Sequence, residues 1–89
     1  MKLNVEEMFD EECKGALDYY SWHIEYKDIA PIISARMYEI AIQEYEHAMF
    51  WFGILKRSGN KMIETYEKDL DEVRNTLFED CEYAERGDW

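Results

Sequence analysis

A glutamate and a histidine three residues apart, Glu44 and His47, lie in the most apolar part of the chain. Residues at this spacing stack on one face of a helix, so their side chains would point the same way. We expect that face to be buried, because large apolar residues recur on it at steps of three and four: Ile33, Met37, Ile40, Trp51 and Ile54. A buried carboxylate is unfavourable unless something compensates its charge, and a metal ion is one such compensation. The pair is therefore a candidate for metal binding.

The same spacing also fits a protein that holds no metal. Glutamate is abundant in this sequence, so a histidine three residues after one arises often by chance. His47 would then be a core histidine that is hydrogen-bonded to Glu44. We expect Glu46 to lie in solvent, because it points about 100° away from His47 on a helix. His23 lies about 16 Å of helix beyond Glu12 and is expected to be structural or exposed.

Cap and turn signals predict where the first two helices begin and end. Asn4, with Glu7 three residues later, has the form of an N-terminal cap and predicts a helix from about Val5 to Asp28. Proline suits the first position of a helix, so a second helix should run from Pro31 to about Lys56. The apolar stripe expected for the first helix consists of Val5, Met8, Phe9, Cys13, Ala16, Leu17, Tyr20 and Ile24.

A second turn separates off a third helix. The stretch Arg57-Ser58-Gly59-Asn60 combines a basic end, a glycine stop and a new cap. A narrower amphipathic helix should follow from about Lys61 to Ala84, with residues 85–89 as a frayed tail. Its expected apolar seam consists of Met62, Tyr66, Leu70, Val73, Leu77 and Cys81. The fold class is therefore all-α, an antiparallel helical hairpin plus a third helix.

Length and charge limit the classes of function. We expect a single helical domain over residues 1–89, with a thin core of its own. The formal net charge of −11 disfavours nucleic acid and anionic membranes as partners and attracts cations. We expect neither a signal peptide nor a transmembrane helix. Cys13 and Cys81 form no metal or redox motif, which indicates reduced thiols and a cytoplasmic location.

The predicted hairpin brings a third metal-binding side chain to the same height. In an antiparallel pair, residues at one height have a nearly constant sum of positions. A turn near residues 28–29 places Glu12 level with Glu44 and His47. Two carboxylates and an imidazole are ligands that iron and manganese accept. A carboxylate-bridged di-metal bundle needs each member of this set twice, so the sequence predicts a homodimer with the site at its interface.

These residues resemble the ferritin-like superfamily, in particular its half-length branch of encapsulated ferritins and rubrerythrin-type bundles. The resemblance covers about residues 10 to 50 and rests on three features. They are Glu12-x-x-Gly15-x-x-x-Tyr19, the proline-led second helix and Glu44-x-x-His47-Ala48. It implies a four-helix bundle in which Glu12 and His47 are terminal ligands and Glu44 bridges two irons. Tyr19 would be a catalytic residue that tunes the site from just outside the ligands.

The resemblance implies binding and oxidation of Fe(II), a possible ferroxidase activity, with two irons per dimer and manganese as another option. A homodimer or higher homo-oligomer is expected. An encapsulating shell is a further possible partner, although no docking tail is recognisable after Ala84. The alternative is a metal-free structural or interaction module, a dimerising three-helix protein of the kind that a phage or mobile element could encode.

Overall fold

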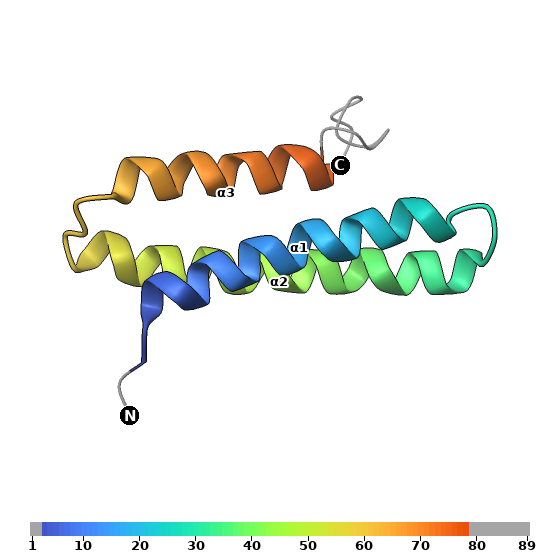
Figure 1. Ribbon diagram of the computed structural model, residues 1–89, viewed down its shortest axis with the longest axis horizontal. Coiled ribbons are helices and arrows are strands. Elements are labelled where there is room, and N and C mark those ends of the chain that lie inside the picture. Colours follow the sequence, from blue (N-terminus) through green and yellow to red (C-terminus); the bar gives the residue numbers. More distant parts are fainter. Residues whose placement is uncertain (1–2, 79–89) are drawn as a thin grey trace.

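The structure is a computed structural model that describes residues 3–78. Within this range the chain forms three α-helices and no strand: α1 (Val5–Tyr26), α2 (Pro31–Arg57) and α3 (Ile63–Phe78). Helices α1 and α2 form an antiparallel hairpin, and α3 lies along the half of it that is remote from the α1–α2 turn (Figure 1). The prediction of an all-α hairpin with a third helix is confirmed. Cys81 and the predicted helical turns up to Ala84 lie outside the described residues.

The predicted caps and turns form in the structure. The Asn4 side-chain oxygen accepts a hydrogen bond from the Glu7 backbone N–H at 3.0 Å, and α2 begins at Pro31. Gly59 has a φ of 70°, the left-handed conformation that ends helices and favours glycine. The Asn60 side chain then accepts a hydrogen bond from the Met62 N–H at 2.7 Å. Local signals in the sequence therefore set the start of α1 and both connections between the helices.

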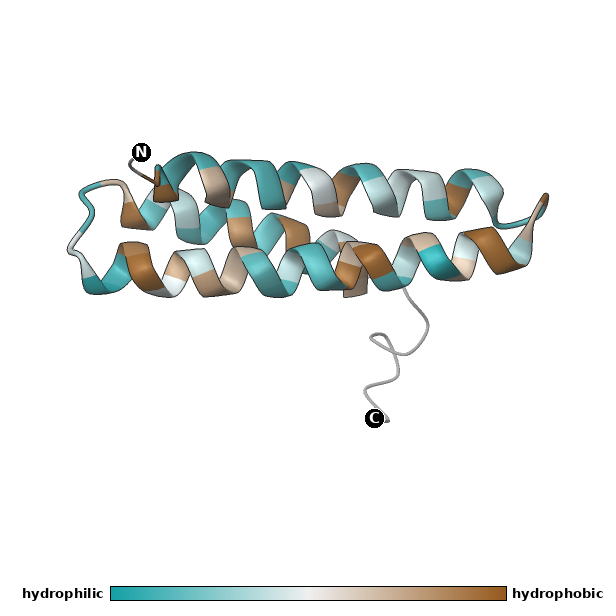
Figure 2. Ribbon diagram, turned by 90° about the horizontal axis from the view of Figure 1, so that it is seen from below, coloured by the Kyte–Doolittle hydropathy of each residue, from teal (hydrophilic) through white to brown (hydrophobic). Residues whose placement is uncertain are grey.

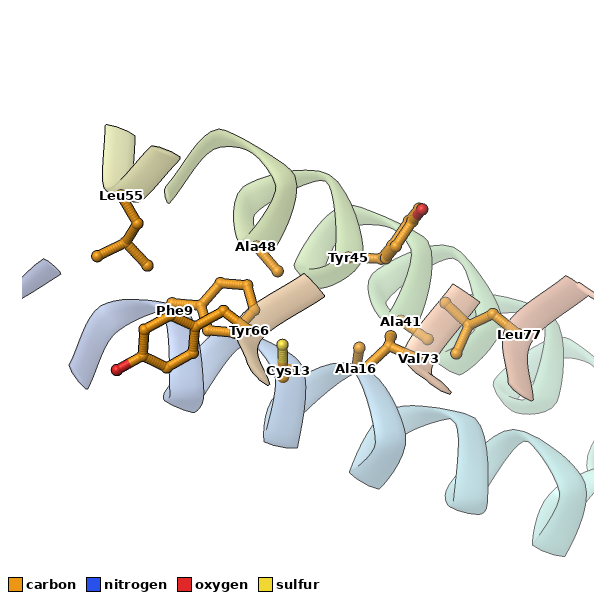
Figure 3. Packing of buried hydrophobic residues seen from close by; sticks show 10 residues of the cluster. All are labelled: Phe9, Cys13, Ala16, Ala41, Tyr45, Ala48, Leu55, Tyr66, Val73 and Leu77. Carbon is orange, nitrogen blue, oxygen red and sulfur yellow. The ribbon is translucent and has the colours of Figure 1, made fainter. Parts of the chain in front are cut away.

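The core forms where the three helices meet. Phe9 of α1 is fully buried, and its ring meets the edge of Tyr66 of α3 at a centroid distance of 5.2 Å. Helices α1 and α2 approach each other through residues without bulk, Ala16, Ala41 and Ala48, all of them 0% exposed. Figure 3 shows the buried hydrophobic cluster of residues 3–78: Phe9, Cys13, Ala16, Ala41, Tyr45, Ala48, Leu55, Tyr66, Val73 and Leu77.

The predicted buried stripe of α2 is wrong by one position. Its buried residues are Ser34, Ala41, Tyr45, Ala48 and Leu55, whereas Ile33 is 47% exposed and the His47 side chain is 61% exposed. The prediction followed the largest apolar side chains. The helices instead pack closely along small residues, because alanine allows two helix axes to approach. The large apolar residues are left on the flank.

Helix α3 covers one face of the hairpin. The Tyr38 hydroxyl donates to the Leu77 carbonyl at 2.8 Å, Tyr45 packs against Phe78, and the Tyr66 hydroxyl donates to Glu6 at 3.0 Å. Figure 2 views the hairpin from below the view of Figure 1, from the side remote from α3, so that α1 and α2 lie in front and α3 behind them. We call this side of the hairpin the open face. It carries Glu12, Tyr19, Ile33, Ile40, Glu44, His47 and Trp51, by the helical phase of these residues relative to the core.

Some residues of the predicted apolar stripes are exposed in the structure. Leu17 and Ile24 of α1 are 38% and 49% exposed, and Met62, just before α3, is 52% exposed. The last turns of α1 extend past Phe78, the last described residue of α3, so the described part of α3 does not reach them (Figure 1). Among residues 3–78, no helix combines the length and apolar content that crossing a membrane requires.

Candidate metal centre

Glu12, Glu44 and His47 converge at mid-length of the hairpin. The His47 Nδ1 atom lies 3.2 Å from Glu12 Oε2 and 3.6 Å from Glu44 Oε2. One ligand atom from each residue lies within 4.8 Å of the other two. The predicted height match between Glu12 on α1 and the Glu44–His47 turn of α2 is therefore confirmed. The three groups come from both helices, so the hairpin register alone assembles them.

The spacing of these atoms fits a shared metal ion. Oxygen and nitrogen ligands lie about 2.0–2.2 Å from such ions, so neighbouring ligand atoms are about 3 Å apart. The two separations at His47 are close to this value. Two carboxylates and an imidazole suit iron, manganese or zinc, whereas copper(I) prefers sulfur ligands. The donor set and its geometry therefore fit a metal site with further positions open to other ligands.

The ligand atoms are accessible from the open face. The side chains of Glu12 and Glu44 are 22% and 25% exposed, and that of His47 is 61% exposed. His47 is consequently not the core histidine of the metal-free interpretation. Glu46 is exposed, as predicted. The site is therefore open to solvent on one side.

Glu44 is the electrostatically strained member of the set. Its hydrogen bond with Glu12, its burial and the repulsion by the Glu12 charge together raise its pKa from 4.5 to about 7, against an opposing effect of His47. A second negative charge beside Glu12 is unfavourable, so Glu44 keeps its proton at pH values where an ordinary glutamate has lost it. A divalent cation would replace that proton and remove the repulsion. The arrangement favours binding of a cation between the two acids.

We expect the metal-free protein to lose stability as the pH rises from about 4.5 to 7. The folded state holds a proton on Glu44 in this window and the unfolded state does not, so deprotonation opposes folding. After allowance for solvent screening, the loss should be about 1–2 kcal/mol. Urea unfolding with a chelator at pH 5 and pH 8 measures it. Glu44→Gln should reduce the difference in unfolding free energy between the two pH values. A variant whose stability depends on pH as much as that of the wild type would show that Glu44 is not the group responsible.

Gly15 provides the space in which the Glu44 carboxyl group lies. A Cβ atom at position 15 would stand 3.4 Å from Cδ and Oε1 of Glu44, at the tight edge of van der Waals contact. Gly15 follows Glu12 by one helical turn and therefore lies beside it on α1. Glycine at this position lets the Glu44 side chain rest against α1 next to Glu12. The sequence pattern Glu12-x-x-Gly15-x-x-x-Tyr19 contains Gly15 but did not predict its contact with Glu44.

Tyr19 and His23 lie closer to the C-terminal end of α1 than Glu12 does. Tyr19 lies two turns after Glu12 on α1, and its ring packs edge-on against Trp22 at a centroid distance of 5.1 Å. His23 lies farther along and joins α1 to α2: its Nδ1 atom is 2.9 Å from the Ser34 hydroxyl, which itself donates to the His23 carbonyl at 2.7 Å. The predicted structural use of His23 is confirmed. The buried Ser34 that completes it was not foreseen.

Comparison with known proteins identifies no relative: no family model matches the sequence, and neither a curated protein nor a solved structure matches the chain. The class of the protein must therefore be argued from the hairpin and the three converging side chains.

Proposed function

We propose that this chain is a ferritin-like protein that binds and oxidises Fe(II) at a site shared between two copies. The observation that carries the proposal is the convergence of Glu12, Glu44 and His47 across the α1–α2 hairpin. This is half of the ligand set of a carboxylate-bridged di-iron bundle, a glutamate from one helix and Glu-x-x-His from its neighbour. The net charge of −11 adds a long-range attraction for cations.

A second copy would complete the site and cover the open face. Two hairpins that meet through these faces make a four-helix bundle with two such half-sites opposed. Large apolar residues surround the ligands on this face, among them Ile33, which is 47% exposed, and the partly buried Ile40 and Trp51. Covering them adds hydrophobic burial that a chain of this size otherwise lacks. Apolar burial and metal ligation would thus favour the same pairing.

Each ligand has a place in the reaction. Glu44 is hydrogen-bonded to Glu12, and its Oε2 atom lies 3.6 Å from the His47 Nδ1 atom; it would be the ligand shared by both ions, while Glu12 and His47 would each bind one ion terminally. Bound iron would supply the redox chemistry: two Fe(II) ions would each lose one electron, and dioxygen would take up these two electrons and two protons to form hydrogen peroxide. Metal entry would release the proton held by Glu44. Tyr19 would orient or tune the ligands. Manganese would occupy the same donor set.

Iron stoichiometry and oxidation test the proposal. Anaerobic addition of Fe(II) to the purified protein should saturate at about two irons per dimer, the number that two opposed half-sites hold. Admission of air should then produce the ultraviolet absorption of Fe(III). Glu44→Ala should abolish both effects, whereas Glu46→Ala, which changes an exposed acid two residues away, should abolish neither. Retention of both by Glu44→Ala, or a dimer that binds no iron, would favour the metal-free dimerising module.

A further inference from the structure

The two ends of the hairpin differ in a way that suggests how two copies meet. The end at the α1–α2 turn presents exposed isoleucines: Ile29 is 75% exposed, Ile32 87% and Ile33 47%. We call these three residues the apolar tip, and Figure 2 shows the hydrophobic colouring of this end. The opposite end has an open hollow of about 570 Å³, lined in part by Leu3, Val5, Ile54, Leu55 and Ser58. We call it the end hollow.

We propose that two copies pair antiparallel through their open faces, with the apolar tip of each copy seated at the end hollow of the other. This inference rests on the proposed function, because the shared site sets where the twofold axis passes. That axis must run through the Glu44–His47 turn. Ile33 lies eleven residues before Glu44, and Ser58 lies eleven residues after His47 (44 − 33 = 11; 58 − 47 = 11). A twofold axis perpendicular to α2 therefore brings Ile33 level with Ser58 of the second copy.

The face of α2 on which these residues lie supports the pairing. Eleven residues are close to three full helical turns, so Ile33 shares the phase of Glu44. Ile54, which lines the end hollow, follows His47 by seven residues and shares its phase. The interface would thus run continuously from the tip, through the metal ligands, to the hollow. Each contact occurs twice, as in any isologous dimer.

Two further arguments favour the antiparallel arrangement of the copies. A twofold axis parallel to the helices would bring tip against tip and leave both hollows uncovered. The size of the face also suits a stable dimer. Helices of 22 and 27 residues side by side present about 700 Å², near the roughly 800 Å² per partner of a standard interface. A second copy of this chain is therefore the occupant that we assign to the open face.

Chemical cross-linking distinguishes antiparallel from parallel pairing of the two copies. Two variants that each add one cysteine, Ile33→Cys and Ser58→Cys, are mixed in a Cys81→Ser background, with Cys13 left buried, and treated with a short bismaleimide linker. The mixed dimer should form at least about tenfold faster than with the control, because proximity raises the effective concentration. The control is Ile24→Cys with Ser58→Cys. Ile24 is 49% exposed and therefore reactive as a cysteine. It lies three turns after Cys13 on the face of α1 that is turned toward α3, so it lies outside the proposed interface.

The same samples separate failure of this inference from failure of the proposed function. Homodimers of Ile33→Cys as the main product would show parallel pairing, and no cross-link above the control would show another interface or a monomer; each overturns the inference. Mn(II) stoichiometry is measured on the same variants before cross-linking. Two Mn(II) per dimer with tip-to-tip cross-links would leave the proposed function standing. Tip-to-hollow cross-links without saturable Mn(II) binding would support the pairing and remove the metal site.

Discussion

Replacing Glu44 by leucine should change stability in opposite directions with and without metal. In the metal-free chain, Glu44 is held against Glu12 and its pKa is raised to about 7, so its charge opposes folding at pH 8. An apolar side chain of similar size removes that cost and should stabilise the fold by about 1 kcal/mol. With Mn(II) present the order should reverse. Binding at 100 times the dissociation constant stabilises the wild-type chain by about 2.7 kcal/mol, and the variant gains nothing.

Unfolding by urea in a chelator and again in Mn(II) measures both effects. Glu46→Leu serves as the control, because Glu46 is exposed and should leave both curves nearly unchanged. A Glu44→Leu variant that is less stable in the chelator would mean that the carboxylate stabilises the metal-free fold. An equal gain from Mn(II) in the wild type and the variant would place the bound ion elsewhere.

Phe9→Ala should be the most destabilising single truncation in the core. Phe9 is 0% exposed and contacts Tyr66 of α3 and Phe52 of α2, with ring centroids 5.2 and 6.3 Å away. Removing a buried phenyl ring costs about 3–5 kcal/mol from lost burial and the cavity left behind. A domain of this size has only about 5–10 kcal/mol in total. The variant should therefore unfold at a much lower urea concentration, with α3 no longer held on the hairpin.

Phe50→Ala is the matched control for this truncation. Phe50 is 60% exposed and packs on its neighbour Trp51, so its loss should cost less than about 1 kcal/mol. Both variants are compared by circular dichroism during urea unfolding, in the presence of a chelator. A loss for Phe9→Ala no larger than that for Phe50→Ala would show that the three helices are not held by this aromatic cluster.

The hairpin and the centre of the site could be predicted because local signals determine them. Asn4, Pro31 and Gly59 each have a conformational preference that acts within a few residues, and all three mark helix ends in the structure. Once the turn near residue 28 is fixed, antiparallel geometry sets the heights of all other residues. The approach of His47 to Glu12, 35 positions apart, followed from that geometry alone.

The position of α3 could not be predicted in the same way. It depends on which face of the hairpin offers the better packing, and small residues decide that. Ala41 and Ala48 contribute little hydrophobicity, so the apolar pattern pointed to Ile33 and its neighbours, although the alanines form the close contact. The Tyr66–Glu6 and Tyr38–Leu77 hydrogen bonds join residues that are distant in sequence and carry no local signal. The exposure of His47 and Ile33 follows from the same choice of face.

A crystal grown with Mn(II) and measured at an anomalous wavelength tests the central claim most directly. The claim is that Glu12, Glu44 and His47 of two copies hold metal between them. The expected result is a pair of anomalous peaks related by a twofold axis, each next to Glu12, Glu44 and His47. Peaks elsewhere, or ordered copies whose Glu44 and His47 side chains face solvent without metal between them, would contradict the claim.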